Sequence, residues 1–432
     1  MKKVLIIVYY WPPSGGAGVQ RWLKFVKFLP QFGWQPTVIT TKNGDYPVLD
    51  ESLEKEVPGN IQVIRTKTPT FRKLFSTVES IPYGSLESKS GDSFSRKTAL
   101  WFRRHLIIPD ARKVWNRYAL SAASKELKSN DYDAVITSGP PHSTHLVGLK
   151  IREKSGVKWL ADFRDPWTKI DYLEKVKRHP LTEKWDRKLE TRVVHGCDMI
   201  LSINQKILND LEAQNKGVII PNGFDPADFK IPGKKETTDF QINYFGNITA
   251  ERNPLIVLKA VNRIFSDAPE IRLNFWGNVS AEIKEQLAGL DKNNILSIHN
   301  YIPHDQMLEK MLNSSLLLLL INNVPDNTGI LTGKLYEYLG AKIPILGIGP
   351  VEGEAAFILQ TTKTGRMFDY DQQKEIAEFI LDQYKHEHDN NFDTDEINKF
   401  SRQQQTRQLA EILSLLTNLE KVYEEDSPFK KS

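Results

Sequence analysis

The sequence predicts an α/β protein with two doubly wound domains, in each of which a parallel sheet is covered by helices on both faces. The chain has 432 residues, which is too long for a single hydrophobic core. Short apolar runs alternate with amphipathic segments along most of its length, as expected of repeated strand–helix units. This alternation stops once, at the linker-like stretch 226–239, and then restarts.

The first domain is predicted to span residues 1–225. It opens with KVLIIVYY, an unbroken apolar run typical of a strand buried on both faces, and residues 18–33 follow with helical spacing. The stretch 71–118 interrupts the alternation of strands and helices and is predicted to be a basic helical insertion. Further strands are expected at 34–41, 61–68, 132–141, 157–167, 197–204 and 216–225.

The second domain is predicted to span residues 226–399, with the same alternation of strands and helices. A last helix from about residue 400 to 423 comes after the second sheet is complete, so 400–432 is treated as a separate segment. The strands expected in the second domain lie at 240–247, 271–278, 294–302, 316–323, 343–350 and 365–370.

Cysteine usage and hydropathy indicate a cytoplasmic protein. Cys197 is the only cysteine, so no internal disulfide can form, and a reducing compartment is the default. The apolar run at the N-terminus is followed by Pro12, Pro13 and a glycine cluster, which favours a first strand over a signal peptide. No apolar run reaches the roughly 18 residues that a membrane span requires.

The net charge of +4 is unevenly distributed. Residues 65–128 carry an excess of about nine positive charges. Within 97–118 large aromatic residues lie among the cations, a composition that suits an anionic membrane surface at the inner face of the cell membrane. Nucleic acid would be attracted by the same charges, and an ordinary solvated helix with core aromatics would share the composition. We expect no nucleic-acid partner.

Ligands of doubly wound sheets bind beyond the carboxyl ends of the strands, so the loops that follow strands are the candidate sites. After the strand at 316–323, Thr332 and Gly333 lead into a helix that carries Lys334 and, three residues on, Glu337. A helix start and a Lys attract a diphosphate, and a carboxylate accepts hydrogen bonds from ribose hydroxyls. A plain i,i+3 ion pair on a surface helix is the alternative.

A second candidate loop follows the strand at 240–247. Gly246 and Asn247 end this strand, and Arg252 comes shortly before the next helix. An Arg at this place can hold a diphosphate with its forked pair of N–H groups. We therefore predict that Gly246, Asn247 and Arg252 contribute to the same donor site as Lys334.

The first domain offers three more loops. Gly15, Gly16 and Gly18 follow the first strand, where backbone N–H groups could hold an anion or a sugar hydroxyl, although a tight turn would also need glycine. The pattern is not GxGxxG, and the second strand ends in Thr, which disfavours a dinucleotide-binding oxidoreductase. Asp162 and Arg164 are predicted to contact an acceptor, unless they only form an ion-paired loop.

Three residues of the first domain are candidates for acid–base catalysis: His142, His145 and Asp165. The two histidines follow a strand, and an imidazole titrates near neutral pH, although a capping loop with surface imidazoles is the alternative. The sequence has no CxxC, HExxH or P-loop pattern, so we expect neither a metal ion nor another cofactor.

Seven segments together resemble the glycosyltransferase group 1 family (family 4) of the GT-B fold, and the resemblance covers nearly the whole chain. The resemblance implies two Rossmann-like domains facing a cleft, with the last helix crossing back to the first domain. It also implies a retaining, metal-independent transferase of the bacterial cell-surface glycan type, with the donor in the second domain and the acceptor in the first. Lys334 and Glu337 carry over as contacts to the diphosphate and the ribose. The seven segments, in order, are GGAGVQRW, SGPPHSTH, WLADFRDPW, VIIPNGFD, INYFGNI, YIPHDQMLEKM and GKLYEYLGAKIPIL.

The sequence departs from the family pattern at two places. Where many relatives have a first Glu that touches the donor sugar, this chain has Gly329, and Asp326 is the nearest acid. Where many have an Arg and a Lys, only Arg252 is present, followed by Asn253. Both departures concern the donor sugar and the diphosphate clamp.

The prediction is therefore a hexosyl-transferring enzyme that uses a nucleotide-diphospho-sugar and a glycan or lipid-linked acceptor. A nucleotide-sugar epimerase of the same fold is one alternative, although such chemistry usually needs several acid–base groups around the donor. A sugar- or polyanion-binding protein without activity is another. The presence of both Lys334 and Glu337 favours the enzyme.

Overall fold

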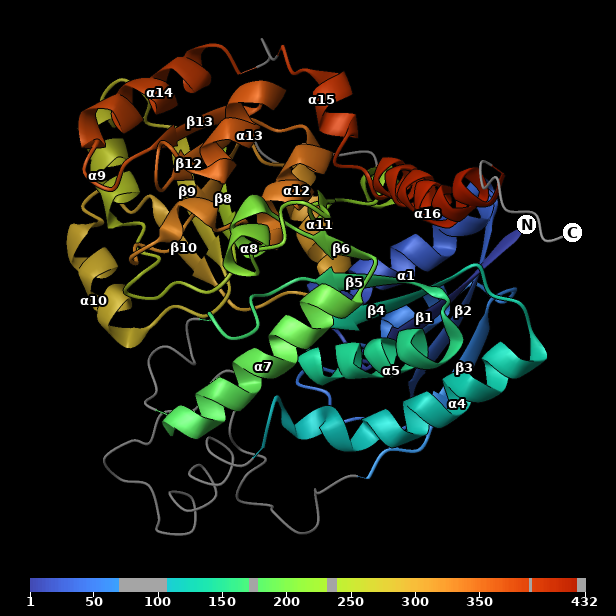
Figure 1. Ribbon diagram of the computed structural model, residues 1–432. Helices are drawn as coiled ribbons and strands as arrows, with labels where there is room; N and C mark the ends of the chain where they lie inside the picture. Colours follow the sequence, from blue (N-terminus) through green and yellow to red (C-terminus); the bar gives the residue numbers. More distant parts are fainter. Residues whose placement is uncertain (70–106, 171–177, 231–238, 388–390, 426–432) are drawn as a thin grey trace, which may run out of the picture. The chain divides into compact units, whose positions relative to one another are not determined.

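The structure is a computed structural model that describes residues 1–69, 107–170, 178–230, 239–387 and 391–425 (Figure 1). The chain divides into two compact units, residues 1–221 with 405–432 and residues 222–404. We call them unit 1 and unit 2. Most of the predicted insertion at 71–118 lies outside the described residues, and its remainder includes a 3-10 turn and the start of helix α4 (Asn116–Ser129).

Unit 1 is built on a seven-stranded parallel sheet with the strand order β3-β2-β1-β4-β5-β6-β7. The strands are β1 (Lys2–Val8), β2 (Trp34–Thr41), β3 (Gln62–Thr66), β4 (Ala134–Gly139), β5 (Lys158–Phe163), β6 (Met199–Ser202) and β7 (Gly217–Ile219). The helices are α1 (Ala17–Phe28), α4 (Asn116–Ser129), α5 (His145–Ser155), α7 (Pro180–Gly196), α8 (Gln205–Asp210) and α16 (Arg402–Glu425).

Both faces of this sheet are covered, as the unbroken apolar runs predicted. In β1, Val4, Ile6 and Val8 pack against α1 and α16, whereas Leu5 and Ile7 pack against the layer of α4, α5 and α7. The period-2 alternation of a strand sends these side chains to opposite faces.

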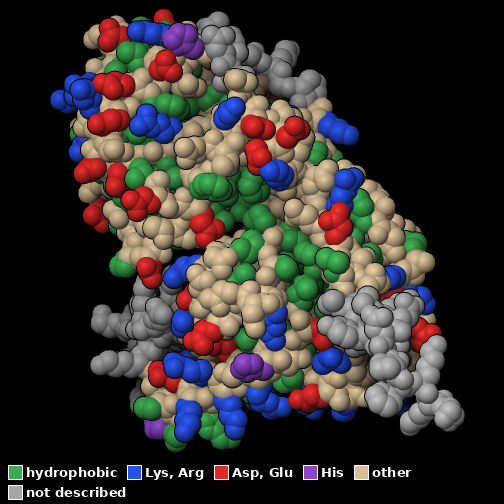
Figure 2. Space-filling view, turned by 45° about the horizontal axis from the view of Figure 1, so that its top comes forward, with side chains coloured by type: hydrophobic (Ala, Val, Ile, Leu, Met, Phe, Trp, Pro, Cys, Tyr) green, Lys and Arg blue, Asp and Glu red, His purple; other side chains and the backbone are tan. Residues whose placement is uncertain are grey.

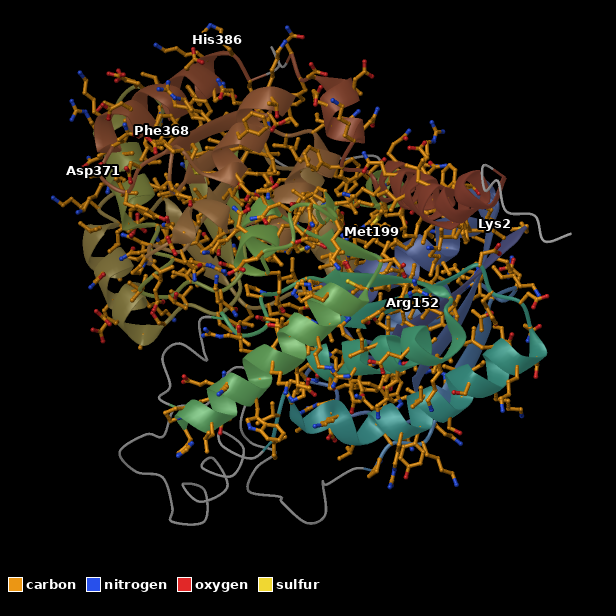
Figure 3. The ribbon with its side chains drawn as sticks, viewed as in Figure 1. Lys2, Arg152, Met199, Phe368, Asp371 and His386 are labelled. Carbon is orange, nitrogen blue, oxygen red and sulfur yellow. The ribbon has the colours of Figure 1, made fainter. Side chains whose placement is uncertain are left out.

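Helix α16 comes after unit 2 in the sequence and returns to unit 1. Leu409, Leu413 and Leu416 belong to its core. Its second half is tied to the first strand, because Lys2 Nζ donates to Thr417 Oγ1 at 2.7 Å, and Lys2 is labelled beside this helix in Figure 3. The expectation that the last helix crosses back to the first domain is confirmed.

Unit 2 is a six-stranded parallel sheet with the order β10-β9-β8-β11-β12-β13. Helices α9, α10 and α14 cover one face, and α11, α12 and α13 the other. The strands are β8 (Phe240–Phe245), β9 (Ile271–Trp276), β10 (Leu296–His299), β11 (Leu316–Leu320), β12 (Ile345–Ile348) and β13 (Gly365–Phe368). The helices are α9 (Leu255–Ile264), α10 (Ala281–Leu290), α11 (His304–Leu312), α12 (Gly333–Ala341), α13 (Glu354–Thr362), α14 (Gln373–Lys385) and α15 (Thr394–Asn398).

The α/β class with two doubly wound parallel sheets is thus confirmed. Within the described ranges, no helix combines the length and hydrophobicity needed to cross a membrane.

Candidate functional site

Each sheet has one point where the strand order reverses, between β1 and β4 in unit 1 and between β8 and β11 in unit 2. Ligands of open parallel sheets bind at such points, beyond the carboxyl ends of the strands. The predicted loops follow these four strands, and the loop with Arg164 follows the adjacent β5. The topology therefore places the predicted residues at the edge where a ligand would bind in each unit.

In unit 2, the start of α12 carries the predicted pair. Lys334 Nζ lies 2.8 Å from Glu337 Oε2, one helical turn further on. Thr332 precedes the helix without capping it, and no acidic residue lies in the first turn. The N–H groups of this turn therefore present partial positive charge that no side chain of the cap neutralises.

His304, at the start of α11, completes this cluster. Its Nε2 lies 3.4 Å from Glu337 Oε1, the carboxylate oxygen that Lys334 leaves open. Burial alone would raise the pKa of Glu337, but the hydrogen bond from His304 and the charge of Lys334 lower it below its usual value. The hydrogen bond to Glu337 in turn raises the pKa of His304. Sequence reasoning missed His304, because its partner lies 33 residues further along the chain.

The loop after β8 joins the loop after β11. Gly246 has φ +149°, a conformation that side chains disfavour, and its carbonyl oxygen lies against Gly277 at the end of β9. Arg252 Nε donates to Asn322 Oδ1. Among the described residues, however, Arg252 forms no hydrogen bond or ion pair with Lys334 or Glu337. The two parts of the predicted diphosphate clamp therefore lie on neighbouring strand ends without touching each other.

In unit 1, Asp162 has no exposed surface. Its carboxylate accepts hydrogen bonds from Trp22 Nε1 at 2.8 Å and from Ser138 Oγ at 2.6 Å, and it pairs with Arg21 at 3.4 Å. Asp162 therefore holds α1 against β4 and β5 from within. Its oxygens are enclosed by protein donors in this structure, and contact of Asp162 with an acceptor stays a prediction.

Arg164 lies over the first turn of α1. Its Nε donates to Ser138 Oγ at 3.2 Å and its Nη2 to the Pro140 carbonyl at 3.0 Å. A Cβ at Gly18 would lie 1.3 Å from Nη1, so only glycine leaves room for this guanidinium. Helix α1 has no acidic residue in its first turn and no side-chain cap. The guanidinium and the helix start thus meet at one place, where both would favour an anion or a hydroxyl.

The neighbouring glycines serve the turn itself. Gly15 donates its N–H to the carbonyl of Val48 at 2.9 Å, and Gly16 is the residue before α1, with φ +106°. They bring the loop after β2 against the start of α1.

Both predicted histidines are buried. His142 stacks on Trp167, with ring centroids 5.3 Å apart, and His145 stacks on Phe163 at 4.3 Å. Burial lowers the pKa of His142 to about 3 and that of His145 well below its usual value, so both rings are neutral at neutral pH. His142 Nε2 must donate to the Pro166 carbonyl, 3.1 Å away, because a carbonyl only accepts.

The remaining ring nitrogens, His142 Nδ1 and His145 Nε2, both lie against Gly139 at the end of β4. Each is buried and has no hydrogen-bond partner among the described residues. A ligand could reach them only if this loop moved. Proton transfer by either ring stays a prediction.

Asp165 is half-buried, and its surroundings favour the neutral carboxyl. Burial raises its pKa, although the nearby Arg164 opposes this shift. A carboxyl whose pKa is raised can exchange a proton closer to neutral pH.

Asp110 is a further residue of this edge that sequence reasoning missed. Its two oxygens accept from the backbone N–H and the hydroxyl of Ser143, each at 2.8 Å, and it caps the turn at Arg112. It thereby fastens the segment that starts at residue 107 to the loop after β4. A capping pattern at Asp110 is visible in the sequence, but Ser143 lies too far along the chain to be paired with it.

No protein-family model matches this sequence, and no curated protein matches it significantly. Solved structures do match. One is HepE from Anabaena in complex with UDP, with 13% identity over 96% of this chain and 100% of that chain and a TM-score of 0.62. Another is a glycosyltransferase from Rickettsia africae ESF-5, with 15% identity, coverage of 97% and 99%, and a TM-score of 0.60.

A third similar structure is a putative UDP-N-acetylglucosamine 2-epimerase from Listeria monocytogenes, with 12% identity, coverage of 99% and 98%, and a TM-score of 0.53. At such low identity the likeness concerns the fold. The chain has the GT-B type of fold, with two parallel sheets of seven and six strands flanked by helices, which the sequence resemblance predicted.

Proposed function

We propose that this protein is a glycosyltransferase that takes a sugar from a nucleotide-diphospho-sugar bound to unit 2 and transfers it to an acceptor bound to unit 1. One observation carries the proposal: the Lys334–Glu337 pair at the uncapped start of α12, beside the switch point of the second sheet. A cation, free N–H groups and a carboxylate on one helical turn match the diphosphate and ribose of such a donor.

Each group has a distinct role in this proposal. The diphosphate approaches the backbone at Gly333, which is exposed and has no Cβ, and takes charge-assisted hydrogen bonds from the helix start and Lys334. Glu337 accepts the ribose hydroxyls, and His304 holds its carboxylate in place. Gly246, Asn247 and Arg252 supply the second contact to the diphosphate. UDP is the first nucleotide to test, because the HepE structure contains it.

In the proposed reaction an acceptor hydroxyl oxygen forms a bond to the anomeric carbon. The bond from this carbon to the diphosphate oxygen breaks, and the electron pair leaves with the nucleoside diphosphate. The hydroxyl proton passes to a base of the site. We propose Asp165 as this base, and His142 and His145 as the other candidates for proton transfer. We also propose that Arg164, which lies against Gly18, and the turn of Gly15 and Gly16 contact the acceptor.

We further propose that transfer retains the anomeric configuration and needs no metal ion, since the helix start and Lys334 stabilise the leaving diphosphate. The acceptor is a glycan or a lipid-linked sugar of the cell surface, and the enzyme works in the cytoplasm or on the inner face of the membrane. Gly329, which lies in a 3-10 turn before α12, leaves the donor sugar without the acidic contact found in many relatives.

The proposal is tested by incubating the protein with UDP-, GDP- and ADP-sugars and a panel of glycan and lipid-linked acceptors. Mass spectrometry should detect an acceptor heavier by one sugar and an equal amount of free nucleoside diphosphate. Binding of donor without any turnover across the panel would favour a sugar- or polyanion-binding protein.

A nucleotide-sugar epimerase is the second candidate, because one similar structure is a putative epimerase. The same incubation without acceptor separates the two activities. An epimerase changes the configuration of the donor sugar, which NMR detects directly. A transferase leaves the donor unchanged until an acceptor is added.

A further inference from the structure

Helix α7 exposes two large apolar side chains. Leu181 is 61% and Trp185 66% exposed, whereas Thr182, Asp186 and Val193, on another face of the helix, are buried. Residues four apart lie on the same face of a helix, so Leu181 and Trp185 form one apolar patch near the start of α7. Exposed apolar side chains that are grouped in this way often mark a contact surface.

Cations surround this patch. Lys184, Arg187, Lys188 and Arg192 are exposed on the same helix, against the single exposed carboxylate of Glu183. Among the described residues, neither Lys184 nor Arg187 nor Lys188 forms an ion pair. Figure 2 shows one face of the molecule, with groups of Lys and Arg side chains and of Asp and Glu side chains on its surface. The charges of Lys184, Arg187 and Lys188 can therefore attract a partner outside the protein.

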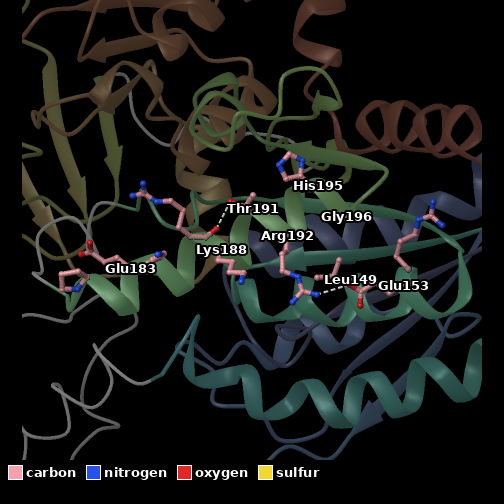
Figure 4. Close-up of a pocket in the computed structure, with 12 residues that line it drawn as sticks. Leu149, Glu153, Glu183, Lys188, Thr191, Arg192, His195 and Gly196 are labelled. Atoms are coloured by element: carbon pink, nitrogen blue, oxygen red, sulfur yellow. Dashed lines mark hydrogen bonds and ion pairs between the residues drawn. The ribbon is translucent and has the colours of Figure 1, made fainter.

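A groove of about 970 Å³ runs along the same helix (Figure 4). Helix α7 forms one wall and the second half of α5 the other. Arg192 pairs with Glu153 across the groove at 3.1 Å, and Arg152 pairs with Asp198 at 2.9 Å. The groove is lined by Leu149, Arg152, Glu153, Pro180, Glu183, Lys184, Arg187, Lys188, Thr191, Arg192, His195 and Gly196.

The start of α7 lies at the edge of the unit 1 sheet that the carboxyl ends of the strands form. The helix follows β5 in the chain and leads back to β6, which is parallel to β5, so it begins at the carboxyl ends of the strands. Asp165 lies at this edge. Val48 and Leu49, in the loop after β2, are also exposed there, at 56% and 66%. Contact through α7 would therefore bring the carboxyl edge of the sheet close to the contacted surface.

We propose that α7 docks unit 1 on an anionic lipid surface, with Leu181 and Trp185 at the level of the headgroups and the cations on the lipid phosphates. Trp prefers the membrane–water interface, and Lys and Arg beside it are attracted by anionic lipids. The binding itself does not depend on the proposed transferase activity.

This surface differs from the one expected from the sequence, which was the segment 97–118. The predicted membrane segment at 97–118 lies outside the described residues up to residue 106, including Trp101, Phe102, Arg103 and Arg104. Trp115 is fully buried and packs edge-to-face on Tyr9, so it is a core residue and cannot anchor the protein at a membrane.

Vesicle co-sedimentation tests the proposal with the full chain. The protein should bind vesicles of phosphatidylcholine with phosphatidylglycerol at low salt, should bind pure phosphatidylcholine far less, and should be released as salt rises. Reversing Lys184 and Lys188 to Glu should lower binding at least about tenfold. Leu181→Ser with Trp185→Ser should weaken the binding that persists at higher salt.

Matched controls come from unit 2. Phe357 is as exposed as Trp185, at 66%, and Phe357→Ser should leave vesicle binding unchanged. Lys284→Glu with Lys374→Glu changes the net charge equally and should also have little effect. Circular dichroism confirms folding of each variant. The proposal is overturned if wild type ignores anionic vesicles at low salt, or if the α7 variants bind as wild type does. Equal competition by soluble polyphosphate, with no effect of the apolar variants, would overturn it in favour of a soluble polyanion.

Discussion

His304 and Glu337 face each other across the starts of two helices of unit 2, with His304 Nε2 3.4 Å from Glu337 Oε1. Lys334 Nζ lies 2.8 Å from the other carboxylate oxygen, Glu337 Oε2. Glu337 is therefore held between an ammonium group and an imidazole before any ligand arrives, and these contacts fix its orientation and lower its pKa. A carboxylate prepared in this way is suited to accept hydrogen bonds from two adjacent hydroxyls.

Removal of either charged group from α12 should weaken nucleotide binding. Lys334→Ala and Glu337→Ala should each cost about 1–3 kcal/mol of binding free energy, as is typical of hydrogen bonds to charged groups. Isothermal titration calorimetry with a nucleoside diphosphate such as UDP measures the binding free energy of each variant directly. Lys399→Ala is the control, because Lys399 forms an exposed i,i+3 pair with Glu396 at 2.6 Å elsewhere in unit 2. Unchanged affinity in both α12 variants would refute the assigned roles.

The pair of His304 and Glu337 should make stability depend on pH. The pKa of His304 is raised above its usual 6.5, so its contribution is complete below that value and is lost as pH rises through the raised pKa. The pKa of Glu337 is lowered, so its contribution is lost as pH falls from about 4.5 through the lowered pKa.

Urea unfolding of wild type and His304→Gln across pH 6 to 9 tests the histidine part of this linkage. The stability difference between the two should be largest near pH 6 and should shrink as pH rises. A difference that stays constant with pH would show that His304 does not gain a proton from this contact.

The close contact between Gly18 and Arg164 predicts that adding one methyl group at residue 18 destabilises the protein. In Gly18→Ala the new Cβ would overlap Arg164 Nη1, and the guanidinium would have to leave Ser138 and the carbonyl of Pro140. We expect a loss of about 1–3 kcal/mol in the free energy of unfolding. Gly59→Ala, where nothing lies within 4 Å of the new atom, should be close to neutral. Equal stability of both variants in urea would contradict the observed packing.

Transfer should persist when divalent ions are removed. The start of α12 and Lys334 already present positive charge to the leaving diphosphate, so a metal ion is not required for its departure. Activity should therefore be the same in EDTA as in Mg²⁺. If EDTA abolishes transfer and Mg²⁺ or Mn²⁺ restores it, the proposed metal-independent mechanism is wrong.

The strands and their layers were predictable because their signal is local. β1 and β11 are unbroken apolar runs, and a parallel strand buried on both faces requires that composition. The loop after β11 was predictable for a similar reason, since Lys334 and Glu337 are one helical turn apart and their contact follows from helix geometry alone.

Contacts between distant segments were not predictable. His304 meets Glu337, and Asp110 meets Ser143, only because the sheet order brings their loops together. The burial of single polar side chains could not be predicted from the sequence either. Asp162 reads as a polar loop residue in the sequence, but its partners Trp22 and Ser138 lie on other elements and enclose it. The sequence also left open whether Trp115 is a surface or a core residue, and the structure places it in the core of unit 1.

A crystal structure of the protein with UDP or a UDP-sugar tests the central claim most directly. The account predicts that the diphosphate lies at the start of α12 within hydrogen-bond distance of Lys334 Nζ, and that the ribose hydroxyls lie on Glu337, with His304 still against the carboxylate. A nucleotide bound anywhere else, with the Lys334–Glu337 pair undisturbed and free of ligand, would contradict it.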